Sequence, residues 1–577
     1  MSRRPVGIRS ALWMALAAAC AMPLDTAPTA HLVLVPVFES RSAASAVVLT
    51  LDSVAVEVWR GRSRLASEGS HFGPNRSSIT LDIRIPMQDR RDTVDVDLRL
   101  MAGGVVLFRG SSPVEIQAGL STTPAPIPLA YVGTDTSIVS LGITPHDPFV
   151  VLGDTLQFGA AAFAIQGQPV DPIFVSWSTV PAGGATPQGM SLSGAGRLQA
   201  ASNRSRVYVK GTAGNGVSDS VLVTFYSPLP LSGITQGWDQ GCGLAIGGQA
   251  FCWGANYVGQ LGDGTTTDRL TPVSVAGGLV FASLSAGGEH TCGLTTGGAA
   301  YCWGDNLYGE LGDGSNTNSS APVPVTGGLS FTSLVAGTFH TCGLTPGGVA
   351  YCWGDNAGGA LGDSTRTSRT APVPVSGGLT FATLTAGEAH TCGLGSAGAA
   401  YCWGVDSTGA LGNGGFFTRL SPVPVSGGLT FTGLSTGRAH TCGVATGGAA
   451  YCWGDGTFGA VGDGAQAIRG TPVPVSGGLL FTRVAAGGSH SCGLATGGAV
   501  SCWGWNLYGQ VGDSSTTDRF APVPVSGGLA FTGLSVGAMQ SCAVTGGLAY
   551  CWGYNSTGEL GDGSLIHRSV PVPVVYP

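Results

Sequence analysis

Charged side chains are scarce in this sequence. It has 26 Lys plus Arg and 33 Asp plus Glu in 577 residues, and residues 227–577 contain 9 Arg, 17 acidic residues and no Lys, a net charge of −8. The rest of the chain has a net charge of +1. Contact with nucleic-acid phosphates requires basic side chains. We therefore expect no nucleic-acid partner for this acidic segment.

Motifs of common catalytic and membrane-spanning proteins are also missing. No run reaches 18 uninterrupted apolar residues, so we expect no transmembrane helix. The sequence has no phosphate-binding loop, no HExxH pair, no nucleophile elbow and no calcium loop with alternating oxygen ligands. These absences predict a protein that is not an enzyme and that holds no metal or cofactor.

Glycine is abundant, by contrast. The 96 Gly follow no Gly-X-Y period, which excludes collagen, and a hydrophobic fraction of 43% argues against a disordered chain. Glycine supplies the positive-φ positions that hairpins need. High glycine with low charge therefore predicts an all-β protein of many short strands joined by tight turns.

The N-terminus has the pattern of a secretory signal over residues 1–20. Three arginines precede an apolar run over residues 11–19, which is too short to cross a bilayer as a helix. The segment then resembles a bacterial lipobox, in which the cysteine, here Cys20, is lipidated; the alternative is ordinary cleavage close by. Either route predicts export to the extracellular space, the periplasm or the cell envelope, where disulfides persist. Membrane contact is expected only through such a lipid anchor.

From residue 228 onward the chain repeats with a period of 50, which gives seven units. Each unit contains two cysteines, and a tryptophan directly follows the second one. Cys20 is the fifteenth cysteine and the one outside the repeats. The cysteine pairs are Cys242 and Cys252, Cys292 and Cys302, Cys342 and Cys352, Cys392 and Cys402, Cys442 and Cys452, Cys492 and Cys502, and Cys542 and Cys551.

Each cysteine pair brackets a predicted β-hairpin. Cys292 and Cys302 are symmetric about Gly297, and in the last unit Cys542 and Cys551 are symmetric about a Gly-Gly turn. Both turn lengths are common in hairpins and place the cysteines opposite each other, near the lower end of the Cα separations of disulfides. The alternative, zinc, does not fit nine intervening residues and one pair per unit. We expect seven disulfides, one within each unit.

The length of the repeat predicts its architecture. Fifty residues suffice for a four-stranded sheet, and seven such sheets in series can close radially. The unit resembles the regulator of chromosome condensation repeat family. The residues that carry the resemblance are Ala286-Gly287, His290-Thr291, Trp303-Gly304 and Gly309-Glu310-Leu311-Gly312. The resemblance implies a seven-bladed β-propeller over residues 227–577. It also implies closure by strands from both ends of the repeat region, with residues 228–234 and 571–574 as candidates.

The chain before the repeats predicts two small β-sandwich domains. Residues 131–226 resemble bacterial immunoglobulin-like domains in several segments, among them Gly153-Asp154-Thr155-Leu156 and Val175-Ser176-Trp177-Ser178. The resemblance implies that Trp177 lies in the core. Within residues 21–130, two segments, 78–85 and 93–100, alternate polar and apolar side chains as half-buried strands do. The predicted fold class is therefore all-β: a seven-bladed β-propeller preceded by two small β-sandwich (immunoglobulin-like) domains.

Two polar series recur in the repeats. The first is a series of histidines, which could form a ring that binds a metal or an anion. The alternative is a structural role in which each histidine forms a hydrogen bond with the backbone of its own blade, and this role fits better because Gln replaces the histidine in two repeats. The series is His290, His340, His390, His440 and His490, with Gln240 and Gln540 in the outer units. A second series suits side chains that cap their own turns. It comprises Asp263, Asp313, Asp363, Asp463, Asp513 and Asp562, with Asn413 substituting.

Function is expected where the repeats differ at one structural address. The two residues before each His or Gln vary strongly and should form a ring on one face, and a second variable address precedes the Gly-x-Leu-Gly turn. Trp, Phe, Met and Arg at such places are typical of interface anchors; the alternative is neutral drift on exposed loops. The candidate partner-binding residues are Trp238, Asp239, Glu289, Phe339, Glu388, Arg438 and Met539 at the first address and Tyr257, Tyr308, Phe458 and Tyr508 at the second.

These observations predict a secreted or surface-anchored, non-enzymatic binding or scaffold protein whose propeller binds a protein or another cell-surface macromolecule. One alternative is an enzyme inhibitor, because a secreted bacterial inhibitor of β-lactamase has a similar propeller. Another is guanine nucleotide exchange, which the family resemblance implies. The signal peptide, the acidic propeller and the lack of an insertion able to form a wedge argue against exchange.

Overall fold

The structure, a computed structural model, describes residues 12–19, 29–38, 53–71, 81–86, 91–102, 105–117, 127, 130–131, 138–145, 148–164, 168–170, 175–183, 187–203, 205–213 and 216–576. The chain divides into two compact units, Met1–Tyr226 and Ser227–Pro577. Among the described residues, no helix has the length and apolar character needed to cross a membrane. The predicted lipidation site, Cys20, lies outside the described residues.

The first part of the N-terminal unit consists of two antiparallel sheets. β1 (Leu12–Ala19), β2 (Thr29–Phe38) and β5 (Leu81–Pro86) form one sheet in the order β1-β2-β5. β3 (Ser53–Arg60), β4 (Ser63–His71), β6 (Arg91–Ala102), β7 (Val105–Gln117) and β8 (Ala130–Tyr131) form the other, in the order β4-β3-β6-β7-β8. On β6, Val94, Val96 and Leu98 are fully buried while Thr93 and Asp95 are exposed, as the alternation predicts. Asp97 departs from the pattern, because it is buried and pairs with Arg109.

The second part of the N-terminal unit contains shorter strands around a separate core. β9 (Ser140–Thr144), β12 (Gly159–Phe163) and β13 (Pro169–Val170) pair in the order β13-β12-β9. β10 (Phe149–Val151), β14 (Val175–Pro181), β17 (Ser205–Ala213) and β18 (Ser218–Pro228) pair in the order β10-β18-β17-β14, and β11 (Thr155–Gln157), β15 (Ser191–Leu192) and β16 (Arg197–Gln199) in the order β11-β16-β15. Trp177 packs on this core with its ring centroid 5.9 Å from that of Phe158, as predicted. The division at residue 130 stays a prediction.

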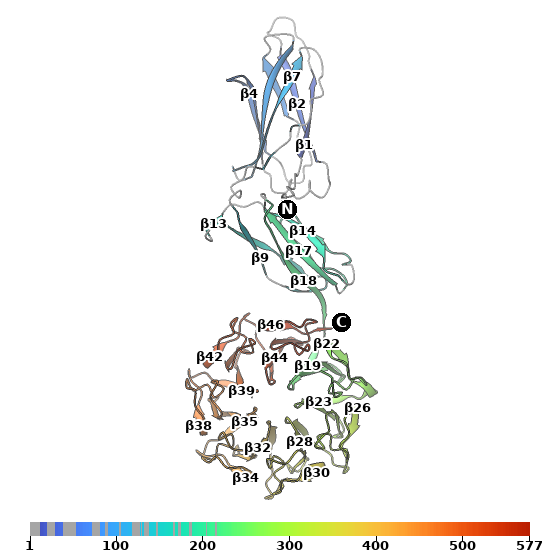
Figure 1. The fold of residues 1–577 in the computed structure, drawn as a ribbon, viewed down its shortest axis with the longest axis vertical. Coiled ribbons are helices and arrows are strands. Elements are labelled where there is room, and N and C mark those ends of the chain that lie inside the picture. The colour runs from blue at the N-terminus through green and yellow to red at the C-terminus, as the bar shows by residue number, and fades with distance from the viewer. Residues whose placement is uncertain are drawn as a thin grey trace, which may run out of the picture. The chain divides into compact units, whose positions relative to one another are not determined.

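The C-terminal unit contains seven four-stranded antiparallel sheets between residues 231 and 573, all within the described part of the chain. Each sheet consists of four strands that are consecutive in sequence, and we number the sheets 1 to 7 in chain order. Figure 1 shows the sheets arranged in a ring, with first strands such as β19, β23, β35 and β39 near the centre and fourth strands such as β26 and β38 at the perimeter.

The strands of the ring have the following bounds. Sheet 1 contains β19 (Leu231–Gln236), β20 (Gln240–Ala245), β21 (Ala250–Gly254) and β22 (Arg269–Ser274), followed by the 3-10 turn η3 (Ala276–Gly278). Sheet 2 contains β23 (Phe281–Ala286), β24 (His290–Thr295), β25 (Ala300–Gly304) and β26 (Ser319–Pro324), and sheet 3 contains β27 (Ser333–Ala336), β28 (His340–Leu344), β29 (Ala350–Gly354) and β30 (Arg369–Pro374). Sheet 4 contains β31 (Thr383–Ala386), β32 (His390–Leu394), β33 (Ala400–Gly404) and β34 (Arg419–Pro424), and sheet 5 contains β35 (Phe431–Thr436), β36 (His440–Ala445), β37 (Ala450–Gly454) and β38 (Arg469–Pro474). Sheet 6 contains β39 (Phe481–Ala486), β40 (His490–Ala495), β41 (Val500–Gly504) and β42 (Arg519–Pro524), and sheet 7 contains β43 (Gly533–Val536), β44 (Gln540–Thr545), β45 (Leu548–Gly553) and β46 (Arg568–Pro573).

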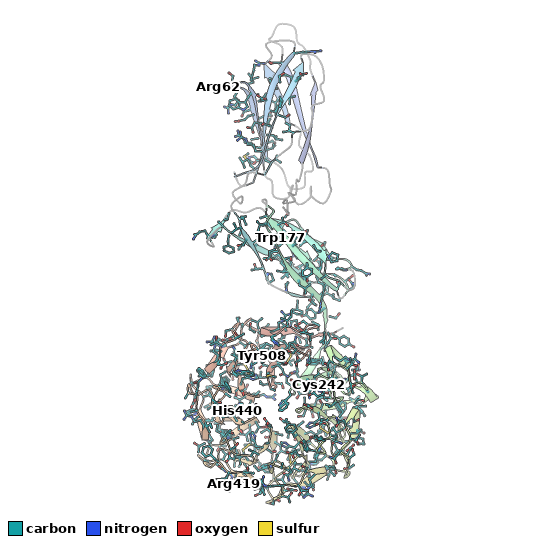
Figure 2. All side chains as sticks on the ribbon, in the orientation of Figure 1. Arg62, Trp177, Cys242, Arg419, His440 and Tyr508 are labelled. Atoms are coloured by element: carbon teal, nitrogen blue, oxygen red, sulfur yellow. A yellow bond between two sulfur atoms is a disulfide. The ribbon has the colours of Figure 1, made fainter. Side chains whose placement is uncertain are left out.

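The seven predicted disulfides are confirmed, one within each sheet. Cys292 on β24 lies directly opposite Cys302 on β25, with their Cα atoms 4.1 Å apart. The shorter last hairpin keeps the same register, since Cys542 is opposite Cys551 across a two-residue turn. Cys242, labelled in Figure 2, belongs to sheet 1. All fourteen side chains are fully buried, so each disulfide is part of the core between sheets.

Each repeated tryptophan packs against the preceding sheet. The indole Nε1 of Trp353 donates a hydrogen bond of 2.8 Å to the carbonyl oxygen of Glu310, which lies in the Gly-x-Leu-Gly turn of sheet 2. Gly312 ends that turn with φ of 66°, and a Cβ there would lie 2.7 Å from Trp353 Nε1. The turn therefore needs glycine for its conformation and for the close approach of the indole. Leu311 of the same turn joins Trp353 in one buried cluster.

The ring closes between sheets 7 and 1 without exchanging a strand. Trp253 Nε1 donates to the carbonyl oxygen of Glu559 at 2.9 Å, the same contact that joins other neighbouring sheets. The predicted pairing of strands from the two ends of the repeat region is present, but most of the candidate residues 228–234 and 571–574 do not take part, because β19 and β46 pair within their own sheets. The pairing of the two ends is limited to Ser227 and Pro228 opposite β47 (Val575–Tyr576). The tryptophan hydrogen bond across this closing junction is the one found at five other junctions, while Trp303 Nε1 between sheets 1 and 2 has no hydrogen-bond partner among the described residues.

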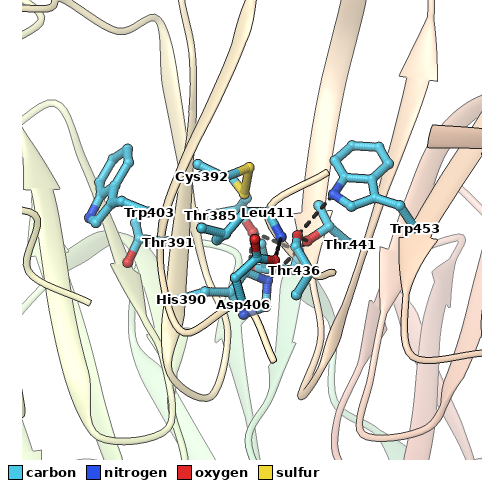
Figure 3. Close-up of a disulfide and its surroundings, with 12 residues drawn as sticks. Thr385, His390, Thr391, Cys392, Trp403, Asp406, Leu411, Thr436, Thr441 and Trp453 are labelled. Carbon is cyan, nitrogen blue, oxygen red and sulfur yellow. Dashed lines mark hydrogen bonds between the residues drawn. A yellow bond between two sulfur atoms is a disulfide. The ribbon is translucent and has the colours of Figure 1, made fainter. Parts of the chain in front are cut away.

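The repeated histidines hold neighbouring sheets together. His390 Nε2 lies 2.9 Å from Thr441 Oγ1 in the next sheet, and Thr441 Oγ1 donates to the carbonyl oxygen of Ala410 (Figure 3). Since that hydroxyl proton is already used, the histidine Nε2–H is the donor to Thr441. The structural role was expected, but the expected bond to the backbone of its own blade is wrong: the hydrogen bond reaches a side chain in the next sheet. The same contact recurs from His290, His340, His440 and His490.

The repeated aspartates cap their own turns, as predicted. Asp263 Oδ1 accepts the backbone N–H of Thr265 at 2.9 Å, and Asn413 accepts that of Gly415 at 2.8 Å. In five sheets the aspartate also pairs with an arginine six residues later. These pairs are Asp263 with Arg269, Asp363 with Arg369, Asp463 with Arg469, Asp513 with Arg519 and Asp562 with Arg568.

Candidate functional site

The variable positions of the repeats lie at one end of the sheets. The first variable address is the turn between the first and second strands, for example Trp238 and Asp239 between β19 and β20. The residue after each Trp-Gly pair donates its N–H to the carbonyl oxygen of this turn, as Asp305 does to Glu289 at 2.8 Å. The same bond recurs in all seven sheets, from Ala255, Asp305, Asp355, Val405, Asp455, Trp505 and Tyr554. We call this end of the sheets the variable face.

Burial separates the repeated residues from the variable ones. The paired cysteines, the tryptophans that follow them and the five repeated histidines are at most 1% exposed. The eleven candidate residues are all partly or largely exposed, with Tyr257 at 52% and Tyr308 at 41%. Variation is therefore concentrated where a partner can reach the side chains.

Three aromatic candidates from three consecutive sheets meet on the variable face. Trp238 of sheet 1 packs edge-to-face on Phe339 of sheet 3, with ring centroids 5.7 Å apart. Tyr308 of sheet 2 packs on the same phenylalanine at 6.1 Å, also edge-to-face. Edge-to-face pairs between sheets hold these rings in a defined arrangement. The sequence predicted the residues but not their contact.

Carboxylates surround this aromatic group. Asp239 is adjacent to Trp238, and burial, followed by repulsion from Glu559 and Glu289, raises its pKa to about 6. Tyr257 forms a hydrogen bond with Glu289, and burial together with that bond raises the tyrosine pKa. The charges acting on Asp239 are thus carboxylates, which makes this part of the variable face strongly negative.

Glu388 and Arg438 occupy the variable turns of sheets 4 and 5. Arg438 Nε lies 2.7 Å from Glu388 Oε2, so these two predicted residues form an ion pair. Arg438 is 62% exposed and the pair is therefore screened by solvent. Met539 is partly exposed at the corresponding turn of sheet 7.

Two further aromatic candidates, Phe458 and Tyr508, belong to a second cluster, on sheets 5 to 7. Tyr508, labelled in Figure 2, has its ring centroid 5.5 Å from that of Trp505 and 4.9 Å from those of Tyr554 and His567. Phe458 contacts Trp505 at 6.3 Å. Residues of the two variable addresses thus contribute to two separate aromatic groups.

Sequence reasoning missed Asp305, Trp505, Tyr554 and His567. The first three occupy the position after the Trp-Gly pair, which varies among Ala, Asp, Val, Trp and Tyr in the seven repeats. That variation was a usable signal. His567 gave no comparable signal, because its role depends on the packing of rings from two different sheets.

Two buried carboxyl groups have unusual surroundings. Glu310 is fully buried, and burial raises its pKa to about 7 although its Oε2 accepts the Tyr308 N–H at 2.8 Å. Asp406 is also fully buried, with its pKa raised to about 6 by burial, and its Oδ1 accepts the Leu411 N–H at 2.9 Å (Figure 3). Within the described residues, no group of three or more His, Cys, Asp or Glu side chains could hold a metal ion.

Comparison with known proteins places the ring among characterised folds. Human WBSCR16 has a similar structure with a TM-score of 0.53 and 20% sequence identity, and the match covers 57% of this chain and 95% of that one. Yeast RCC1 (Prp20), in a structure bound to Kap60, matches with a TM-score of 0.52 and 23% identity over 60% of this chain and 85% of that one. At these identities the likeness establishes the β-propeller fold alone. A search of curated proteins found none that matches the chain.

A family model extends this likeness to the sequence. The model for the RCC1-like domain matches residues 249–576, which include the strands from β21 through β47. That range is more than half of the chain, and it contains six complete sheets and most of the cysteine pairs. The chain is therefore a member of the RCC1-like domain family.

Proposed function

We propose that this chain is an exported, non-enzymatic binding protein that uses the variable face of a seven-bladed, disulfide-linked propeller to hold a protein or another cell-surface macromolecule. In this proposal each four-stranded sheet is one blade, and residues 21–130 and 131–226 are β-sandwich, immunoglobulin-like spacers. The signal at residues 1–20 directs export, with lipidation at Cys20 where a membrane anchor is needed.

One observation carries the proposal: aromatic side chains that differ between otherwise uniform repeats meet at one end of the ring. Trp238 and Tyr308 come from different sheets yet both pack on Phe339 of a third sheet, and all three rings remain partly exposed. Exposed clusters of Trp and Tyr are typical of residues that dominate binding energy in interfaces. Seven buried disulfides also suit a protein that works in an oxidising compartment.

The test compares capture of partners by the full chain and by variants of the two ends of the ring. Trp238→Ala combined with Phe339→Ala removes the aromatic contact on the variable face. Ile246→Ala is the matched control: Ile246 is 76% exposed at the hairpin turn after β20, which is the opposite end of that strand from Trp238. Capture should fall at least about tenfold with the double variant, a loss of about 1.4 kcal/mol or more.

The control should leave capture unchanged. If the double variant, shown by its melting curve to be folded, captures every partner as well as the unchanged chain, the variable face is not the binding surface. If this chain inhibits a secreted enzyme that it captures, the partner is that enzyme. Release of bound GDP from a small GTPase would instead contradict the non-enzymatic assignment.

A further inference from the structure

Two sets of acidic side chains in the propeller have different surroundings. Five aspartates of the outer loops, Asp263, Asp363, Asp463, Asp513 and Asp562, each pair with an arginine of the same loop. Those on the variable face include Asp239, Glu289, Asp305, Asp355, Glu388 and Asp455. Arg438 is the one basic residue among the variable turns and the positions after Trp-Gly, and it pairs with Glu388.

Negative charge therefore accumulates beside the aromatic group of sheets 1 to 3. The carboxylate of Asp239 is repelled by those of Glu289 and Glu559. Tyr257 forms a hydrogen bond with Glu289 and also lies within the electrostatic influence of Asp239 and Asp305. Like charges gathered in this way repel each other and raise the free energy of the unbound face. A bound cation would relieve that repulsion.

A fully buried carboxyl group bonded to the backbone of Tyr308 adds an independent observation. Glu310 Oε2 accepts the Tyr308 N–H, and Glu310 Oε1 has no hydrogen-bond partner among the described residues. The equivalent Glu559 in sheet 7 is fully satisfied, because Thr557 donates to it through both its N–H and its hydroxyl. Tyr308 stands where Thr557 stands in the last repeat and has no hydroxyl near its backbone to donate, so sheet 2 keeps a buried carboxyl oxygen without a hydrogen bond in the side chain that holds the Tyr308 N–H.

The rings supply the second half of a cation site. The face of an aromatic ring attracts ammonium and guanidinium groups through its quadrupole, and the attraction grows when carboxylates are close by. Trp238, Phe339 and Tyr308 are edge-to-face, so the group presents ring faces in more than one direction. Aromatic faces combined with unpaired carboxylates fit a Lys or Arg side chain, whose apolar stem packs on the rings while its charged end reaches the acids.

We propose that the group formed by Trp238, Asp239, Tyr257, Glu289, Tyr308 and Phe339, which we call the Trp238 site, binds a lysine or arginine side chain of a protein partner. The inference deepens the proposed function and rests on it, since it names the chemistry of the partner. A protein partner is favoured over a small free cation because the site is open on the surface of the ring and extends over three sheets. The propeller itself carries no lysine, and the acids of the variable face outnumber its one arginine, so a basic segment is the complementary surface.

The test uses the full chain and a short fluorescent peptide that alternates Lys and Gly, together with the same peptide with every Lys acetylated. Acetylation removes the positive charge and keeps the chain length. The lysine peptide should bind at least about tenfold more tightly than the acetylated one, as measured by fluorescence anisotropy. A form with every Lys trimethylated tests a quaternary ammonium, and tighter binding of that form than of the lysine peptide would overturn the assignment to unmodified side chains.

Two variants locate the binding. Asp239→Asn combined with Glu289→Gln should weaken binding of the lysine peptide about tenfold or more and leave binding of the acetylated peptide unchanged. Trp238→Ala should weaken binding of the lysine peptide severalfold. Glu68→Gln, an exposed acid on β4 of the other unit, and Ile246→Ala serve as matched controls without effect. Equal binding of the two peptides, or binding that survives the Asp239 and Glu289 changes in folded protein, would overturn the proposal.

The outcome separates this inference from the proposed function. Partner capture that depends on Trp238 and Phe339 without any preference for the lysine peptide would remove the cation site and keep the binding face. Partner capture that ignores both residues would remove the binding face itself.

Discussion

His390 of sheet 4 and Thr441 of sheet 5 form a hydrogen bond across the boundary between their sheets, with 2.9 Å between Nε2 and Oγ1. Thr441 passes the contact on to the carbonyl oxygen of Ala410, so one side-chain pair fixes two backbone segments. Nε2 must carry the proton to donate this bond, and burial keeps the imidazole uncharged. The repeat thereby makes the stability of the ring depend on histidine protonation.

The first prediction is that acid weakens the propeller. Burial lowers the pKa of the five histidines from 6.5 to about 3 or 4. In the unfolded chain they protonate near pH 6.5, while in the folded chain they stay neutral, so their contribution is complete above pH 6.5 and is lost as the pH falls. Each histidine should lower the free energy of unfolding by up to about 1.4 kcal/mol per pH unit below about 6.5. Urea unfolding between pH 7 and pH 4 measures this dependence.

The sequence provides the control, since Gln240 and Gln540 occupy the same position in sheets 1 and 7. Gln540 Nε2 donates to backbone carbonyls of Gly237 and Trp238, so glutamine serves at this address. His390→Gln should therefore reduce the slope of stability against pH. Asp239, Glu310 and Asp406 have raised pKa values and act in the opposite sense. A stability that does not fall with acid would contradict the dominance of the histidines.

A second prediction concerns the disulfides. Cys392→Ala combined with Cys402→Ala removes the disulfide of sheet 4, whose cysteines are 10 residues apart in the sequence. The double variant should lower the free energy of unfolding by about 3 kcal/mol, chiefly because the unfolded chain gains freedom. Chemical unfolding of the variant under non-reducing conditions measures this cost. Mass mapping without reduction should show only pairs within a repeat, and a pair between repeats would contradict the register.

Gly312 and Gly314 allow a third, matched comparison. Both have positive φ, 66° and 89°, but a Cβ at Gly312 would lie 2.7 Å from Trp353 Nε1, whereas at Gly314 the nearest atom would be 3.9 Å away. Gly314→Ala should cost about 1 kcal/mol for its backbone conformation alone. Gly312→Ala adds a clash with a buried indole and should cost at least 2 kcal/mol more, on the order of other overpacked cores. Similar melting temperatures for the two variants would show that the indole contact is unimportant.

The fourth prediction concerns Asp406, which stands where other repeats have a buried asparagine such as Asn356. Burial raises the pKa of Asp406 to about 6, so this residue destabilises the fold increasingly as the pH rises from about 4 to 6. Asp406→Asn should stabilise the protein by about 1 to 3 kcal/mol at pH 7, with no difference below about pH 4. Thermal melting at both pH values tests this.

The reverse change serves as its control. Asn356 Nδ2 donates to Asp363 Oδ1 at 2.9 Å, so Asn356→Asp would place two carboxylates together and should be strongly destabilising at pH 7. If both substitutions shift the melting temperature in the same direction, the electrostatic account of this position is wrong.

Much of the fold was predictable because the repeat made it a local problem. The symmetric spacing of Cys292 and Cys302 about Gly297 determines which residues face each other in a hairpin, and the structure has that register. The alternation from Thr93 to Leu100 likewise determined which apolar side chains are buried. Both signals act over about ten residues, within one hairpin or one strand, so neighbouring sequence suffices to read them.

The candidate residues were also visible in the sequence, since variation within a uniform repeat marks exposed positions. The seven repeats, their paired cysteines and the list of variable addresses were thus determined by the sequence alone. Only the tertiary structure decided that each histidine bonds the next sheet, that Trp238 reaches Phe339 two repeats away, and that Tyr508 belongs to a different cluster with His567. These contacts join residues 50 to 100 positions apart, and they depend on the curvature of the ring, which sets how side chains from separate sheets meet.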